Sequence, residues 1–220
     1  MDTVAGVGVL DKAVAVLRAV ADEPRSLAAL TVATGLPRAT AHRLAAALEA
    51  HGLLRRDAAG RFDLGLDLTT LGRLAAERFP LVDLARPVLT DLRDTTGESV
   101  QLFVREGSFR RCVLSLQSPH ALRWIVPDGA LLPLDVGSAG RVLSGATEPT
   151  GATGGGGWIE SVAEREPGVA SVSAPVLDAT GAVIAAVSLS GPIDRIGRAP
   201  GRRYGPAVVA AATHLTDLSA

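Results

Sequence analysis

Apolar side chains recur at helical spacing through the first 65 residues, and the pattern breaks at prolines and glycines. One apolar stripe ends before Pro24 and consists of Val9, Leu10, Ala13, Val14, Leu17 and Val20. Ser26 has the residue type of an N-cap for a short second helix, which Gly35 ends. Pro37 suits the first turn of a third helix, and Gly52 fits its C-terminal stop. The spacing i, i+3, i+4, i+7 predicts the buried face of that helix as Ala41, Leu44, Ala45 and Leu48.

Residues 53–64 follow the third predicted helix and contain two short runs around an Asp/Gly turn, which predicts a β-hairpin. Three helices with a glycine-containing turn between the second and third, followed by a basic hairpin, are typical of a winged helix-turn-helix. Residues 66–79 have the pattern of an amphipathic helix, which Pro80 closes. We interpret this helix as the linker between two domains.

The remaining residues mix helical and strand-like patterns. Helices are expected at 84–96, 138–143 and 204–218, and strands at 99–105, 111–117, 122–127, 169–177 and 182–190. Residues 145–157 are of low complexity, rich in Gly, Thr and Pro, and are expected to be flexible. This order predicts an α+β domain with an antiparallel sheet and helices against one side.

The distribution of charge differs between the two parts of the chain. The whole chain has a formal net charge of −1, and its 47% apolar content excludes a disordered protein. Residues 1–65 contain eight basic and seven acidic side chains, whereas the remainder contains 14 basic and 16 acidic ones. A slightly basic N-terminal part is compatible with nucleic-acid binding there.

Several classes of protein are excluded or disfavoured by what the sequence lacks. The single cysteine, Cys112, excludes an internal disulfide or a Cys-cluster zinc site, and we expect it in the core. No apolar run approaches the ~20 residues that span a bilayer, and the N-terminus has no basic n-region, so we expect a cytoplasmic protein without a membrane partner. The histidines show no metal-binding spacing, and no nucleophile elbow or phosphate loop is present. We therefore expect no enzymatic activity, metal or cofactor; a rival interpretation, an enzyme on the second domain, predicts turnover that depends on Glu164 or Ser138.

Motifs in both halves of the chain resemble those of one protein family. Residues 26–30 (SLAAL), 34–44 (TGLPRATAHRL) and 60–65 (GRFDLG) are similar to the DNA-binding domain of the IclR family of bacterial transcription regulators. Residues 132–134, 137–141, 161–176 and 187–192 resemble segments of its effector-binding domain, in the same order. The chain departs from the family between Ala146 and Trp158, where a longer, helical segment is usual, and at Arg141, where lysine is more common.

The resemblance implies a winged helix-turn-helix at 1–65, a linker helix at 66–80 and a GAF-like domain for effector binding and oligomerisation at 81–220. In a DNA-binding domain of this kind, called the head below, the first residues of the recognition helix contact base edges in the major groove. The residues expected to make these contacts here are Arg38, Ala39, Thr40, His42 and Arg43. The wing would contact phosphates through Arg55, Arg56 and Arg61. The alternative is that these residues form an ordinary solvated helix face and turn.

The resemblance also implies a pocket for a small organic acid or an aromatic compound. Its residues here would be Ala121, Trp124, Ser138, Ala139, Ser161, Ser171, Ser188 and Ser190. Backbone N–H groups at the start of the short helix would attract a carboxylate, and the hydroxyls would complete its hydrogen bonds. Because serine occupies several of these positions, we expect a small and largely neutral pocket.

The expected function is therefore a ligand-responsive regulator, a repressor, that binds a pseudo-palindromic operator. We expect a homodimer or a dimer of dimers, a homotetramer, with the N-terminal and linker helices as contacts. In a rival interpretation the second domain is only an oligomerisation scaffold, because the shortened segment at 147–157 has abolished the pocket.

Overall fold

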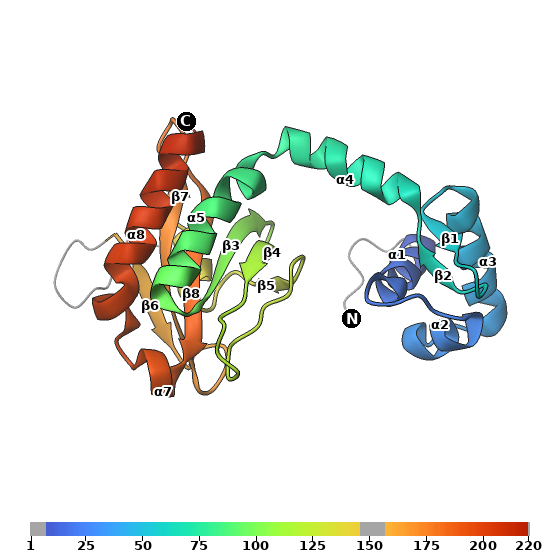
Figure 1. Cartoon of the computed structure of the whole chain (residues 1–220), viewed down its shortest axis with the longest axis horizontal. Helices are drawn as coiled ribbons and strands as arrows, with labels where there is room; N and C mark the ends of the chain where they lie inside the picture. The colour runs from blue at the N-terminus through green and yellow to red at the C-terminus, as the bar shows by residue number, and fades with distance from the viewer. Residues whose placement is uncertain (1–7, 146–156, 220) are drawn as a thin grey trace. The chain divides into compact units, whose positions relative to one another are not determined.

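The computed structural model describes residues 8–145 and 157–219 (Figure 1). The chain divides into two compact units, Met1–Arg78 and Phe79–Ala220. None of the helices among the described residues is long and apolar enough to cross a membrane. The predicted low-complexity segment at 145–157 lies almost entirely outside these residues.

The first unit is a winged helix-turn-helix, as the sequence predicts. Its elements are α1 (Gly8–Ala21), α2 (Leu27–Thr34), α3 (Arg38–Ala50), β1 (Leu54–Arg56), β2 (Phe62–Leu64) and α4 (Leu66–Arg78). The Ser26 hydroxyl accepts a hydrogen bond from the backbone N–H of Ala29 at 3.2 Å and so caps α2. Gly35 ends this helix with a φ of 67°, a left-handed conformation that glycine adopts without steric cost. The two wing strands pair antiparallel, with Leu54 opposite Leu64.

The core of the first unit confirms the periodicity of α3 and corrects that of α1. Ala41, Leu44, Ala45 and Leu48 are the buried residues of α3. In α1, by contrast, the buried residues are Val16 and Val20, while Val9, Leu10 and Val14 of the expected stripe are exposed. Val20 of the stripe is in the core, and Ala13 and Leu17 pack against it, so only the first part of the prediction fails. The reason is that α1 packs on α2 and α3 through its second half. Phe62 from the wing, 1% exposed, packs in the same cluster.

The linker helix α4 has no buried residue. Its apolar side chains Leu66, Leu71 and Leu74 are exposed to solvent. The sequence pattern therefore predicted the helix correctly, but the residues that the structure describes leave its apolar face uncovered.

The second unit is an antiparallel six-stranded sheet in the order β5-β4-β3-β8-β7-β6. Its strands are β3 (Ser99–Glu106), β4 (Phe109–Leu116), β5 (Leu131–Pro133), β6 (Ile159–Val162), β7 (Val169–Leu177) and β8 (Val183–Pro192). Its helices are α5 (Leu81–Thr96), α6 (Ser138–Leu143), α7 (Ile193–Ile196) and α8 (Pro200–Ser219). The predicted α+β class with an antiparallel sheet is confirmed.

Three predictions for this unit need correction. Residues 122–127 form no strand; they run as a loop in which Val126 is buried and Trp124 packs beside it, while Leu122 and Ile125 are exposed. The strands β5 and β6 and the short helix α7 were not anticipated. The final helix begins at Pro200, four residues before the predicted start, because proline is compatible with the first turn of a helix.

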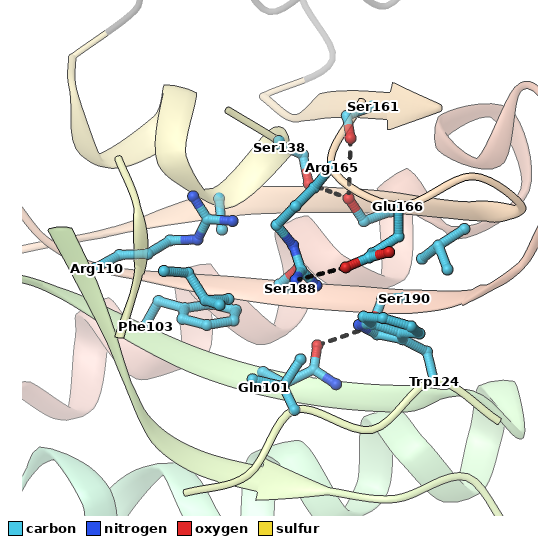
Figure 2. A pocket seen from close by; sticks show the side chains of 16 residues that line it. Gln101, Phe103, Arg110, Trp124, Ser138, Ser161, Arg165, Glu166, Ser188 and Ser190 are labelled. Atoms are coloured by element: carbon cyan, nitrogen blue, oxygen red, sulfur yellow. Dashed lines mark hydrogen bonds and ion pairs between the residues drawn. The ribbon is translucent and has the colours of Figure 1, made fainter. Parts of the chain in front are cut away.

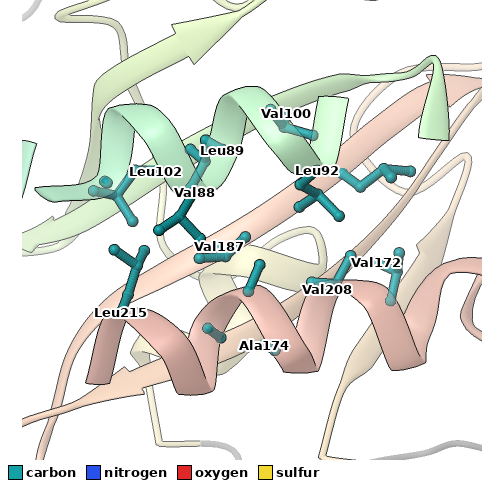
Figure 3. Close-up of a cluster of buried hydrophobic side chains, with 14 of the residues drawn as sticks. Val88, Leu89, Leu92, Val100, Leu102, Val172, Ala174, Val187, Val208 and Leu215 are labelled. Carbon is teal, nitrogen blue, oxygen red and sulfur yellow. The ribbon is translucent and has the colours of Figure 1, made fainter. Parts of the chain in front are cut away.

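Alternation along the strands gives the sheet two different faces. On one face α5 and α8 lie side by side and cover residues such as Leu102, Val172, Val187 and Leu189 (Figures 1 and 3). The intervening positions, whose side chains point to the opposite face, include Gln101, Ser171 and a smaller apolar cluster around Phe103. That second face is covered by α6 and by the loop that carries Trp124 and Val126, so elements lie against both sides of the sheet and not only one.

Candidate functional site

The first candidate site is the exposed face at the start of α3. Arg38, Ala39, His42 and Arg43 are exposed and Thr40 is half-buried, whereas the opposite face of the helix lies in the core. Among the described residues, neither Arg38 nor Arg43 forms an ion pair with an acidic side chain. The core thus fixes α3 by one face and leaves two guanidinium groups on the other face available to an outside anion.

The three wing arginines lie in a different environment, because each has an acidic partner. Arg55 pairs with Asp63, Arg56 with Glu49 at 3.2 Å, and Arg61 with Asp57 at 2.7 Å. The backbone N–H of Arg61 and, next, the Arg61 side chain hold the pKa of Asp57 below its ordinary value. Exposed pairs of this kind exchange readily, since they contribute about 0–1 kcal/mol. A phosphate would nevertheless have to compete with these carboxylates, which it does not have to do at α3.

The second candidate site is a cavity of about 40 Å³ on the sheet face opposite α5 and α8. It is lined by seven of the eight residues that the resemblance implied: Trp124, Ser138, Ala139, Ser161, Ser171, Ser188 and Ser190. The eighth, Ala121, is exposed and lies outside the lining, since its loop turns outward before Trp124. A water molecule requires roughly 10–15 Å³. The cavity therefore admits a group of about three or four non-hydrogen atoms.

The serine side chains form one hydrogen-bonded chain across three strands and α6. Figure 2 shows the end of this chain that includes Ser138 and Ser161. Ser173, which the sequence reading missed, is fully buried and donates to Ser188 at 2.9 Å. Ser138 lies 2.8 Å from Ser173 and 2.7 Å from Ser171, and Ser161 lies 3.4 Å from Ser171.

The direction of this chain follows from the single proton that each hydroxyl carries. Because Ser173 donates to Ser188, Ser138 must donate to Ser173, and Ser171 must donate to Ser138. The proton of Ser188 is therefore not used within the chain. A donor at the wall of the cavity remains available to a bound molecule.

Charged side chains also line the cavity, so the expectation of a largely neutral pocket was wrong. The lining includes Arg110, Arg165 and Glu166. Arg165 forms an ion pair with Glu166 at 3.8 Å, and its guanidinium carbon lies 5.0 Å from the centroid of a Trp124 ring (Figure 2). The lining therefore carries an excess of one positive charge, which comes from Arg110.

Arg110 is 3% exposed and lies with its guanidinium carbon 5.5 Å from the centroid of the Phe103 ring. Its Nη1 donates to the carbonyl oxygens of Pro133 and Val136, the latter at 2.7 Å. Burial and, next, the positive charge of Arg165 lower the pKa of Arg110 to about 10. The structure thus holds a buried cation beside a second cation.

Two glycines around α6 make room for this guanidinium. A Cβ atom at Gly137 would lie 3.3 Å from Arg110 Nη2, and one at Gly140 would overlap Nη1 and the carbonyl of Leu134. Gly137 also has a φ of 83°, which disfavours any residue with a side chain. The small-residue loop at 137–140 is therefore required by the packing of Arg110.

The start of α6, where a ligand carboxylate was expected to bind a backbone N–H, is already in contact with a carboxylate of the chain. The N–H of Gly137 donates to Glu164 Oε2 at 3.0 Å, and Arg141 pairs with Glu164 at 3.0 Å. Glu164 follows Ala163, whose φ of 55° is the only left-handed non-glycine backbone among the described residues. An incoming anion must therefore use other donors or displace Glu164.

Cys112 lies in the smaller apolar cluster behind the cavity and is buried. Burial raises the pKa of its thiol to about 12. A thiol with so high a pKa is unreactive at neutral pH, which agrees with the expectation of a core residue.

The chain matches two family models that together span both units. The IclR helix-turn-helix domain matches residues 9–58, and the bacterial transcriptional regulator IclR C-terminal model matches residues 74–154 and 152–217. The chain belongs to the IclR family of bacterial transcriptional regulators. Because the family's head is a DNA-binding helix-turn-helix, α3 and the wing belong to a DNA-binding domain.

Individual relatives agree with this assignment. The regulator KipR of Bacillus subtilis is 33% identical over 118 residues, which are 54% of this chain and 47% of KipR. The glycerol operon regulatory protein of Streptomyces griseus is 29% identical over 217 residues, and the match covers 85% of each chain. By name, the first is a transcriptional regulator and the second an operon regulatory protein.

A solved structure supports the fold over nearly the whole chain. It is an IclR homologue from Microbacterium hydrocarbonoxydans complexed with 4-hydroxybenzoate, with a TM-score of 0.74 and 21% sequence identity. The similarity covers 95% of this chain and 98% of that one. At this identity the likeness concerns the fold alone.

Proposed function

We propose that this IclR-family regulator is a repressor that binds a pseudo-palindromic operator as a homodimer or dimer of dimers and responds to a small organic effector. The observation that carries the DNA-binding half is the pair of unpaired, exposed arginines at the start of α3, Arg38 and Arg43. A guanidinium can donate two hydrogen bonds to guanine O6 and N7, and Ala39 or the methyl group of Thr40 can contact a thymine methyl. Repression requires only that the operator is occupied, whereas activation requires a further contact with the polymerase.

The wing completes this interface in a different role. Arg55, Arg56 and Arg61 would exchange their carboxylate partners for phosphates and fix the register of α3 without reading sequence. A single head with so few cations binds DNA weakly, so two heads on half-sites about one helical turn apart are needed for specificity. The exposed apolar faces of α1 and α4 offer the surfaces for such a dimer.

The effector half of the proposal rests on the cavity in the second unit. Seven residues implied by the family resemblance converge on it, and the homologue bound to 4-hydroxybenzoate indicates which ligands to try first. The ligand must bind the DNA-competent and DNA-incompetent arrangements with different affinities, since otherwise it shifts nothing. The rival proposal, an oligomerisation scaffold without a ligand, predicts that no small molecule raises the melting temperature.

The decisive experiment for DNA binding is a titration of the purified protein with its own upstream intergenic DNA at two salt concentrations. Arg38→Ala/Arg43→Ala should abolish the preference for a discrete palindrome over random DNA. The matched control is Arg86→Ala/Arg202→Ala, which removes the same charge from exposed helix positions of the second unit and should leave binding unchanged. Equal losses in the two double variants would contradict the role of α3.

A further inference from the structure

Two buried nitrogen atoms at the cavity have no hydrogen-bond partner among the residues that the structure describes. They are Nε2 of Gln101, a residue 1% exposed, and Nε of Arg110, a residue 3% exposed. A buried polar group without a partner costs about 1–3 kcal/mol, and more when it is charged. Such groups in a native protein call for an explanation, and a bound ligand is one.

The orientation of the Gln101 amide is fixed by a neighbouring serine. Ser190 donates to Gln101 Oε1 at 3.0 Å, so the oxygen is occupied and the NH₂ group is the free end (Figure 2). Gln101 lies directly opposite Ser188 in the pairing of β3 with β8. The unpartnered NH₂ group is therefore placed beside the hydroxyl whose proton the serine chain leaves unused.

All three available groups are donors. They are the Nε–H of Arg110, the NH₂ group of Gln101 and the hydroxyl of Ser188. One of them is part of a buried cation that has no acidic side chain within ion-pair distance among the described residues. The negative charge of Asp135 acts on Arg110 from beyond ion-pair distance, but it does not outweigh the burial that lowers the pKa of Arg110. A buried cation without a directly paired counter-ion is costly. A ligand that fits such a site must present acceptors and carry a negative charge.

We propose that Arg110, assisted by Gln101, is the specificity determinant of the cavity and binds the carboxylate of an organic acid as its counter-ion. This inference rests on the proposed function, because it assigns the ligand class of the same cavity. The volume of about 40 Å³ is sufficient for a carboxylate head of three non-hydrogen atoms. The remainder of the acid extends toward Trp124 and Arg165, where the lining is partly open to solvent.

The arrangement selects against uncharged analogues. An amide of the same shape replaces one acceptor oxygen by an NH₂ donor, which would face the donors of Arg110 and Gln101. Charge-assisted hydrogen bonds are also roughly twice as strong as neutral ones. The acid should therefore bind about tenfold to a hundredfold more tightly than its amide.

The test is calorimetric titration of the full chain with four acids and their amides: acetate, propionate, benzoate and phenylacetate. Wild type should bind at least one acid and prefer it to its amide. Arg110→Gln should remove this preference. The matched control is Arg105→Gln, an exposed arginine directly opposite Arg110 in the β3–β4 pairing, which should keep the wild-type preference.

A second variant tests the inference independently, because Arg110→Gln also loses hydrogen bonds to two carbonyl groups and could for that reason fail to fold. Gln101→Glu is nearly isosteric, retains the acceptor for Ser190 and replaces the free donor by a carboxylate oxygen. It should weaken acid binding at least tenfold and should not weaken amide binding, because the NH₂ group of an amide then faces an acceptor. Equal binding of acid and amide by wild type, no binding of any acid, or an unchanged preference in either variant would overturn the inference. Operator binding is measured with the same preparations to test the proposed function separately. Specific operator binding without a preference for the acid would refute only the role of Arg110 and would leave the proposal of a DNA-binding regulator intact.

Discussion

The arginines at the start of α3 in the first unit are exposed, whereas Arg110 at the cavity of the second unit is buried, and the two environments suit two kinds of partner. Arg38 and Arg43 lie on the open face of α3, where water solvates them until a polyanion replaces it. Arg110 lies inside the second unit, where it is almost inaccessible to water and where burial lowers its pKa to about 10. An exposed cation gives affinity that depends on salt, whereas a buried one gives selectivity for a small anion of the correct shape. Exposure, more than residue type, separates the proposed DNA interface from the proposed effector cavity.

The largest expected effect tests whether the two units are independent. Phe62→Ala removes a ring that is 1% exposed from the core of the first unit and should cost about 3–5 kcal/mol in that unit. DNA binding should be lost, while the melting transition of the second unit and its response to acids remain. Calorimetric unfolding of the full chain checks this, and a parallel fall of both transitions would show that the units unfold as one.

The next effect sharpens the contrast between α3 and the wing. Arg38→Ala should weaken operator binding about tenfold to a hundredfold and relax sequence preference, since a bidentate base contact is lost. Arg61→Ala should weaken binding less, because Arg61 must first leave Asp57, and should reduce the salt dependence of log K by about 0.9 for the lost phosphate contact. Fluorescence anisotropy with operator and random DNA separates the two. A loss of sequence preference in Arg61→Ala, with none in Arg38→Ala, would reverse the roles.

A smaller effect concerns the serine chain of the cavity. Ser173→Ala should destabilise the second unit by about 1–3 kcal/mol, because the buried Ser138 hydroxyl loses its acceptor and Ser188 its donor. The exposed Ser144, which bonds only to a carbonyl of its own helix, gives the control Ser144→Ala. Denaturant unfolding of both variants provides the measurement, and equal stabilities would mean that the chain of hydroxyls carries no net stabilisation.

The smallest effect is the expected inertness of Cys112. With a thiol pKa of about 12, only about one molecule in ten thousand carries the reactive thiolate at pH 8. Because burial raises this pKa, labelling should stay slow in the native state up to strongly alkaline pH and become fast on unfolding. Comparison of thiol-reagent kinetics in buffer and in urea checks this. Fast labelling of the native protein would show that the core behind the cavity opens.

The sequence predicted the head better than the cavity, and the reason is the range of the contacts involved. The buried face of α3 depends on helical periodicity and local capping, so four residues were identified from spacing alone. The serine positions came from the family resemblance and agree with strand alternation. Arg110 and Gln101 were missed because their environment depends on how β3, β4 and the loop before α6 meet in space. The sequence contained one indication that Arg110 is buried: it lies two residues before Cys112 and four before Leu114, so strand alternation groups it with these buried positions.

The failed strand at 122–127 has a related cause. An apolar run indicates burial, but in this run only Val126 is buried and Trp124 packs beside it without a neighbouring strand, while Leu122 and Ile125 are exposed. The exposed stripe of α4 is the opposite case: its pattern indicates an apolar partner that the single chain does not supply. In both cases the pattern of apolar residues indicates that the side chains favour burial. Which element packs against them depends on parts of the molecule that are distant in the sequence.

The central claim is that acid binding in the cavity and operator binding by α3 are coupled. The most direct test measures the Kd for the upstream operator with and without a saturating concentration of the acid that binds most tightly. The account predicts a changed Kd in wild type and in Arg105→Gln, no change in Arg110→Gln, and an equal and reciprocal change in acid affinity when operator is present. An operator Kd that stays the same while the acid is bound in the cavity would contradict it.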